Sequence, residues 1–183
     1  MIDPHNITNY NRTTAELEEF LLFAIVVAGK NSQVQARKLS AFLKTVKAFA
    51  IEKGYVFESG DHFANIRVAN NNKVLEFALK RVKMGQYDRI LKTLQYIITT
   101  PVCPYYATFD DLIKIPGVGP KTANFFLLHS KEDYNEAVLD THILKWLREI
   151  GYDKAPKITP QDPKHYKMWN IVFKNEAKRR FNI

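Results

Sequence analysis

Ile-Pro-Gly-Val-Gly-Pro-Lys-Thr-Ala-Asn, at residues 115–124, is the most informative stretch of this chain. Two glycines flank Val118, so the backbone can turn sharply and present successive amides without obstruction by side chains. Pro120 suits the first turn of a following helix, because its φ angle is already helical and its missing N–H would find no partner there. The amides of the bend would then lie beside the positive end of that helix. The stretch therefore predicts a bend that can bind a phosphate group.

Helical periodicity surrounds this bend on both sides. Capping patterns at Thr13–Glu16 and Ser32–Gln35 begin two early helices. Further helical segments are expected at about 73–83, 87–97, 110–113, 121–130, 138–150 and 163–181. Residues 54–72 fit a loop or a small hairpin around Ser59-Gly60-Asp61, with a turn at 70–72. The expected fold class is all-α.

The composition is that of a folded globular chain, with 183 residues of which 46% are hydrophobic and 25% are charged. The longest apolar run is too short to span a bilayer, and residues 1–12 lack the apolar stretch of a signal peptide. We therefore expect an intracellular (cytoplasmic, nucleoid-associated) protein without membrane contact. Cys103 is the only cysteine, which excludes internal disulfides and four-cysteine zinc or iron–sulfur sites.

The charge balance favours a polyanionic partner. There are 27 Lys and Arg residues against 19 Asp and Glu residues, a net charge of +8. Nucleic acid is the usual partner of such a surface, and a basic surface that is merely solvated is the alternative. Candidate phosphate contacts form three clusters, which are Lys44, Lys47 and Lys53; Lys80, Arg81 and Lys83; and Lys174, Lys178, Arg179 and Arg180.

A second motif follows the bend. Residues 138–143 read Val-Leu-Asp-Thr-His-Ile, and Asp140 lies 19 residues after Lys121. Together the two motifs resemble the endonuclease III superfamily of DNA glycosylases, in which a helix-hairpin-helix motif precedes an aspartate in a Val-Asp-Thr-His sequence. The resemblance covers most of residues 13–150. It implies a two-lobed unit over residues 1–183, with a hairpin-bearing core at about 73–150 and the N-terminal helix pair 13–53 and C-terminal helix 163–181 packed around it.

The resemblance also implies roles for single residues. Lys121 would be the nucleophile of a bifunctional glycosylase and lyase, forming a Schiff base with the sugar, whereas its position alone also fits a phosphate contact. Asp140 would stabilise the cationic sugar, and its position equally fits the N-cap of the next helix. His142 is expected to pack within its helix. DNA contacts are expected from Pro116, Gly117, Val118, Gly119 and Thr122.

The chain departs from these relatives in two places that bear on the site. It lacks their cysteine quartet, so no iron–sulfur cluster and no other cofactor is expected, although a monovalent cation at the hairpin is compatible with the resemblance. Where endonuclease III carries a glutamine that fills the gap left by the flipped base, this chain has Gly29-Lys30-Asn31. Lys30 and Asn31 are therefore the candidates for that role.

The expected activity is removal of an oxidised base from double-stranded DNA by a monomer, with cleavage at the abasic site. In lacking the iron–sulfur cluster, the chain resembles the 8-oxoguanine branch of the superfamily. Its Asp-Thr-His and Lys-Thr-Ala-Asn sequences instead resemble endonuclease III. The excised base can therefore be an oxidised purine or an oxidised pyrimidine. Two alternatives also remain: a phage-type enzyme of this fold that acts on a hypermodified thymine without strand cleavage, and a non-catalytic DNA-binding module.

Overall fold

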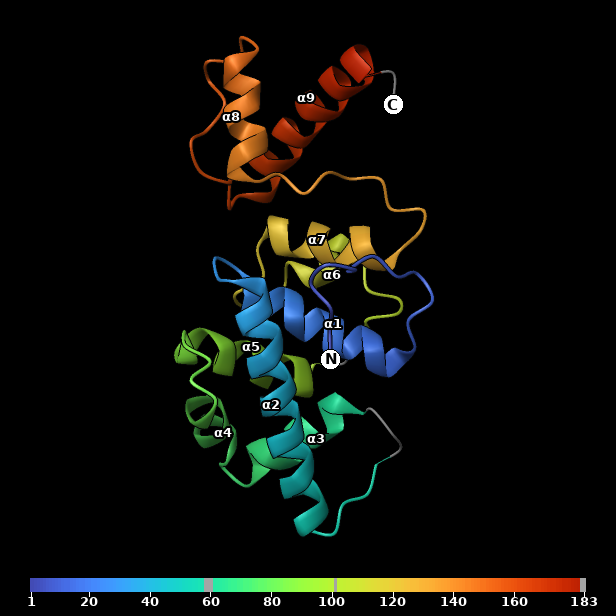
Figure 1. Cartoon of the computed structure of the whole chain (residues 1–183), viewed down its shortest axis with the longest axis vertical. Coiled ribbons are helices and arrows are strands. Elements are labelled where there is room, and N and C mark those ends of the chain that lie inside the picture. Colours follow the sequence, from blue (N-terminus) through green and yellow to red (C-terminus); the bar gives the residue numbers. More distant parts are fainter. Residues whose placement is uncertain (58–60, 101, 182–183) are drawn as a thin grey trace.

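The computed structural model describes residues 1–57, 61–100 and 102–181, and these residues form helices and no strand (Figure 1). The helices are α1 (Thr14–Val27), α2 (Ser32–Glu52), α3 (His62–Asn71), α4 (Leu75–Arg81), α5 (Tyr87–Thr99), α6 (Phe109–Leu112), α7 (Pro120–Ser130), α8 (Thr141–Glu149) and α9 (Pro163–Phe181). The all-α class is confirmed. Ser59 and Gly60, part of the expected turn, lie outside the described residues. In the described part of the chain, no helix is long and apolar enough to cross a membrane.

The first two helices begin at polar caps. Thr13 accepts a hydrogen bond from Glu16 N, and the Glu16 carboxylate accepts one from Thr13 N at 2.8 Å, which confirms the first capping box. The cap of α2 is Asn31, whose side chain accepts from Val34 N at 3.0 Å. Ser32 is therefore the first helical residue and not the cap, because the Asn31 side chain already pairs the free amide.

Helix α1 is the centre of the main hydrophobic core. Its residues from Phe20 to Val26 are all buried, since α2, α3 and α7 pack around this helix. Phe20 stacks on Phe126 of α7 with ring centroids 5.5 Å apart. A helix that is apolar on every side is stable only when it is covered on every side. The second helix of the predicted hairpin thus packs against the most buried element of the fold.

Helix α3 corrects the expectation for residues 62–71, because these residues are helical and not a loop or hairpin. Asp61 caps the helix. Glu18 of α1 also accepts hydrogen bonds from two of its first amides, those of His62 (2.8 Å) and Phe63 (3.1 Å). Glu18 is 44 residues away from His62 in the sequence. A tertiary contact therefore stabilises this helix start, and local sequence patterns do not reveal it.

The last two helices form a separate, smaller hydrophobic cluster. Its buried members are Leu139, Leu144, Leu147, Ala155, Tyr166 and Trp169. The main cluster contains the buried residues from Leu17 to Leu127. Figure 1 shows α8 and α9 together at one end of the molecule, at the top of the view, with α7 beneath them. The irregular segment 131–140 joins α7 to this end, and it carries Asp140.

Ionisation of Glu18 is expected to make the stability of the fold depend on pH. Burial raises the pKa of Glu18 to about 7, and the two amide hydrogen bonds offset part of this rise. The folded-state pKa of Glu18 lies above the ordinary value of 4.5. The contribution of Glu18 to the unfolding free energy is therefore complete below pH 4.5 and is lost as the pH rises through 7. Glu18→Gln keeps the acceptor, since one carboxylate oxygen accepts both amides. We expect the variant to be more stable than wild type by about 1–3 kcal/mol at pH 8 and equally stable below pH 5.

Urea unfolding of both proteins between pH 5 and pH 8 measures this effect. Burial lowers the pKa of His62, so other groups also titrate in this range. The informative quantity is therefore the difference in unfolding free energy between the two proteins. A difference that does not change with pH contradicts the prediction.

Candidate nucleic-acid interface and active site

A tight turn joins α6 to α7. Ile115 N donates to Leu112 O at 3.1 Å, and Val118 N donates to Ile115 O at 3.0 Å. The side chains of Ile115 and Val118 are buried in the main cluster and anchor the turn. Gly117 has a φ of +82°, a left-handed conformation that glycine adopts without steric cost. The predicted bend is confirmed.

Two side chains of α5 hold this turn from its carbonyl side. Thr93 Oγ1 donates to Pro116 O at 2.6 Å, and Arg89 Nη1 donates to Gly117 O at 3.1 Å. The same guanidinium donates through Nη2 to Ile25 O of α1 at 3.0 Å. Neither residue belongs to the motifs recognised in the sequence. The one signal available was the position of Thr93, a polar residue at helical spacing within the apolar stripe of α5.

The opposite side of the turn leaves backbone amides free. Pro120 begins α7, as predicted, and the first backbone hydrogen bond of the helix runs from Ala123 N to Gly119 O at 3.0 Å. Among the described residues, the amides of Gly119, Lys121 and Thr122 therefore have no acceptor. Free amides at a helix N-terminus attract anions through hydrogen bonds and the helix dipole. This side of the turn can bind a phosphate group.

These features are those of a known DNA-contacting element. A family model described as the helix-hairpin-helix motif matches residues 107–129. The segment is a helix-hairpin-helix motif. Among curated proteins and solved structures, none matches the chain. Because helix-hairpin-helix motifs commonly bind DNA, the match supports a DNA partner.

A cleft of about 480 Å³ opens beside the helix-hairpin-helix motif. Of the described residues that line it, Lys121 is the one lysine, and its side chain is exposed. Gly117, Gly119 and Thr122 of the motif lie on the same wall. The apolar lining consists of Pro4, Ile7, Phe23, Ala24, Val27, Ala28 and Phe125. The cleft thus combines an apolar wall with one amine at the start of α7.

Asp140 is the N-cap of α8. Its carboxylate accepts hydrogen bonds from His142 N and Ile143 N, both at 2.9 Å. The cap interpretation is confirmed, whereas a catalytic role stays a prediction. Asp140 does not line the cleft, but its neighbour Leu139 accepts a hydrogen bond from Thr159, which does. His142 is exposed and not packed as expected, because it lies in the first turn of α8 on the side away from the second cluster.

Lys30 and Asn31 serve visible structural roles at the turn between α1 and α2. Lys30 Nζ donates to Met84 O at 2.9 Å, and Asn31 caps α2. Of this stretch, Gly29 lines the cleft, with a φ of +70°. Filling the gap left by a flipped base stays a prediction for Lys30 and Asn31.

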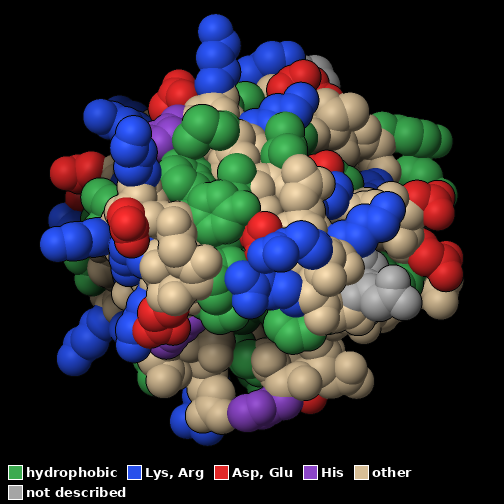
Figure 2. All heavy atoms as spheres, turned by 90° about the horizontal axis from the view of Figure 1, so that it is seen from above, with side chains coloured by type: hydrophobic (Ala, Val, Ile, Leu, Met, Phe, Trp, Pro, Cys, Tyr) green, Lys and Arg blue, Asp and Glu red, His purple; other side chains and the backbone are tan. Residues whose placement is uncertain are grey.

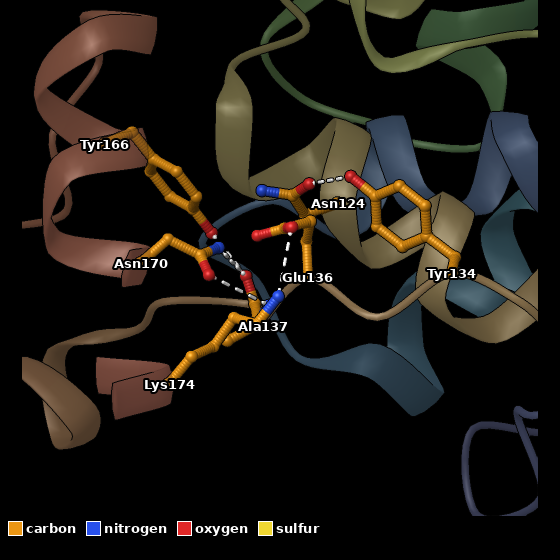
Figure 3. A network of polar contacts seen from close by, with 7 residues as sticks. All are labelled: Asn124, Tyr134, Glu136, Ala137, Tyr166, Asn170 and Lys174. Atoms are coloured by element: carbon orange, nitrogen blue, oxygen red, sulfur yellow. Dashed lines mark hydrogen bonds and ion pairs between the residues drawn. The ribbon is translucent and has the colours of Figure 1, made fainter. Parts of the chain in front are cut away.

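A polar network fixes the chain segment that leads to Asp140 (Figure 3). The side-chain amide of Asn170 pairs with both backbone groups of Ala137, accepting from its N–H at 3.3 Å and donating to its carbonyl at 2.9 Å. The Tyr166 hydroxyl accepts from Leu139 N at 2.7 Å. Both side chains come from α9 and are buried. Helix α9 therefore holds the backbone immediately before Asp140.

The same network reaches α7. The Tyr134 hydroxyl donates to the side chain of Asn124, a buried residue three positions after Lys121. Burial raises the pKa of both Tyr134 and Tyr166, so their hydroxyls remain protonated donors at neutral pH. The network thus couples the helix of Lys121 to the segment of Asp140. Sequence patterns do not reveal this network, since none of its contacts is local.

The cationic clusters differ in how far they are neutralised. In the C-terminal cluster, Lys174 pairs with Glu136 at 3.1 Å, and Arg179 and Arg180 pair with Glu176 at 2.7 and 3.0 Å. In Figure 2, which views the molecule from the end formed by α8 and α9, Asp and Glu side chains lie between the Lys and Arg side chains.

In the described part of the chain, no three His, Cys, Asp or Glu residues form a group that can hold a metal ion.

Gly117→Ala tests how tightly α5 holds the turn. A Cβ at this position would lie 2.9 Å from Arg89 Cγ and 3.0 Å from Thr93 Oγ1. Gly54 is a matched control, because it has the same φ of +82° and no atom within 4 Å of a Cβ. We expect Gly54→Ala to lower the unfolding free energy by about 1 kcal/mol, and Gly117→Ala to lower it by a further 1–2 kcal/mol, roughly. Equal losses in chemical denaturation would show that the turn is not tightly held.

Proposed function

We propose that this protein is a DNA glycosylase with abasic-site lyase activity, acting on an oxidised base in double-stranded DNA as a monomer. The observation that carries the proposal is the position of Lys121. Its amine lies at the start of the second helix of a helix-hairpin-helix motif, on the wall of a cleft of about 480 Å³. A nucleotide whose phosphate binds the free amides of the motif would have its sugar near this amine.

The chemistry follows from an amine in that place. In its neutral form, Lys121 Nζ attacks C1′ of the deoxyribose, the glycosidic bond breaks, and the base leaves with the bonding electrons and takes up a proton. The sugar ring opens to a Schiff base on Nζ. Loss of a proton from C2′ then breaks the C3′–O bond, and the downstream strand leaves with that phosphate as its 5′ end. Hydrolysis of the imine returns the free lysine.

Two further features support this proposal. The apolar part of the cleft can receive a base that has been turned out of the duplex, since flipped bases pack against apolar and aromatic side chains. Asp140 is held by two backbone amides and linked through the network of Figure 3 to the helix of Lys121. A fixed carboxylate near the sugar would stabilise the positive charge that develops as the base leaves.

Borohydride trapping of the Schiff base tests the proposal. Duplexes carrying 8-oxoguanine, thymine glycol, 5-hydroxymethyluracil or an abasic site are incubated with the protein and sodium borohydride. We expect a covalent adduct with wild type and a yield at least about 100-fold lower for Lys121→Ala and Lys121→Arg. Lys121→Arg keeps the positive charge, so it separates nucleophilic attack from phosphate binding.

Lys114→Ala is the matched control for these variants. Lys114 belongs to the same motif but is exposed, pairs with Asp111 at 3.4 Å and does not line the cleft. This variant is expected to form the adduct at the wild-type level. If wild type binds the duplexes and forms no adduct on any of them, including the abasic duplex, the protein is a DNA-binding module or an enzyme of another reaction class.

Asp140→Asn separates the capping role of this residue from its proposed catalytic role. Asparagine caps helices as well as aspartate does, so the unfolding free energy is expected to change by less than about 0.5 kcal/mol. Loss of the charge is expected to slow base release by about 10²–10³-fold, measured by single-turnover excision. A stable variant with the wild-type rate would assign Asp140 a structural role alone.

A further inference from the structure

Four cationic residues surround the turn between α4 and α5. Lys30 Nζ donates to Met84 O at 2.9 Å, and Lys38 Nζ donates to Lys83 O at 2.6 Å. Lys83 belongs to the turn itself, and Arg89 lies in the first turns of α5. We call Lys30, Lys38, Lys83 and Arg89 the turn cluster. Its members come from two separate stretches of the sequence, 30–38 and 83–89, so the sequence alone does not group them.

Within the described ranges, the turn cluster has no acidic partner. None of its four members forms an ion pair among the described residues. Burial and the nearby charges of Arg89 and Lys38 lower the pKa of Lys30, so these cations lie close enough to repel each other. Glu76, an acid of this region, forms an ion pair with Lys80 at 2.6 Å and not with a member of the cluster. A group of like charges without a counter-ion is costly to assemble and favours an anionic ligand.

The backbone of this turn is held in an uncommon conformation. Lys83, Gly85 and Gln86 all have positive φ, at 51°, 74° and 50°. Lys83 and Gln86 are not glycines, so each adopts the left-handed region at a cost. The lysine ammonium groups bonded to the carbonyls of residues 83 and 84 stabilise this conformation and thereby keep the positive charges together.

The turn cluster is continuous with the cleft of Lys121. Arg89 lines the cleft and donates to Gly117 O of the helix-hairpin-helix motif. Gly29 and Gln86, the neighbours of the cluster along the chain, also line the cleft. A DNA strand that enters the cleft with one phosphate on the motif therefore passes the turn cluster with another.

We propose that the turn cluster binds a backbone phosphate of the DNA, next to the nucleotide that enters the cleft. The proposal rests on the DNA partner of the proposed function and is independent of the chemistry at Lys121. In this proposal Lys30 and Lys38 contact phosphate. Such contacts contribute to the affinity for DNA and to its orientation, but not to base specificity. Arg89 holds the motif as well, so the three lysines are the residues to test.

The experiment compares two triple variants that remove the same charge. Lys30→Gln, Lys38→Gln and Lys83→Gln are combined in the test variant, and Lys44→Gln, Lys47→Gln and Lys53→Gln in the control. The control lysines form one of the clusters expected from the sequence to contact phosphate. They are exposed, lie in the C-terminal half of α2 and just beyond it, and do not line the cleft. Affinity for a duplex with a tetrahydrofuran abasic analogue is measured by fluorescence anisotropy between 50 and 200 mM salt. Thermal unfolding verifies that both variants are folded.

The test variant is expected to bind about 10–100-fold more weakly at the lowest salt, and the slope of log affinity against log salt is expected to become shallower by about 2–3. The control is expected to change affinity by less than about 3-fold and the slope by less than about 1. Equal changes in the two variants overturn the proposal, because they would reflect total charge alone. Absence of wild-type binding to the duplex overturns it as well.

Two further readouts keep the result decisive. If the triple variant does not fold, Lys83→Gln replaces it, since its ammonium group is not bonded to the turn, and it is expected to make the slope shallower by about 1. Borohydride trapping is measured on wild type in parallel, because it tests the chemistry at Lys121 and not the turn cluster. Failure of trapping in wild type would overturn the lyase and leave the comparison of salt slopes valid.

Discussion

The hydrogen bonds that α5 makes to the hairpin carbonyls determine the geometry of the whole site. Arg89 is half-buried and joins α1, α5 and the helix-hairpin-helix motif through the carbonyls of Ile25 and Gly117. Burial lowers the pKa of Arg89, but a guanidinium remains charged, so its donors must be satisfied within the fold. Because the carbonyl side of the turn is paired in this way, the amide side and Lys121 face the cleft.

The cations at and beside the cleft form no ion pair among the described residues, and the net charge of the chain alone does not reveal this. The free amides of the motif, Lys121 and Arg89 lie at the cleft, and the three lysines of the turn cluster lie beside Arg89. The C-terminal cluster, which looks equally basic in the sequence, is largely paired with Glu136 and Glu176. The turn cluster therefore keeps more of its charge available for an anionic ligand than the C-terminal cluster does.

Local features of the fold were predictable from the sequence, and tertiary features were not. The hairpin turn, Pro120 at the start of α7 and the Thr13 capping box depend on residues that are adjacent in the chain, so their patterns are sufficient. Helix α3 depends on Glu18 from a distant helix, and it was missed for that reason. The same holds for Arg89 and for the network around Asn170, whose partners are separated by tens of residues. Lys121 was identified from its motif, and the cleft beside it required the packing of α1 against α7.

The residue at which the protein becomes joined to DNA is the most direct test of the account. A duplex with an abasic site is reduced with borohydride in the presence of wild-type protein, and the adduct is digested and mapped by mass spectrometry. We expect a single nucleotide remnant on Nζ of Lys121. A remnant on another amine, such as the N-terminal amine of Met1 that pairs with Glu19, or a chain without any remnant, would contradict it.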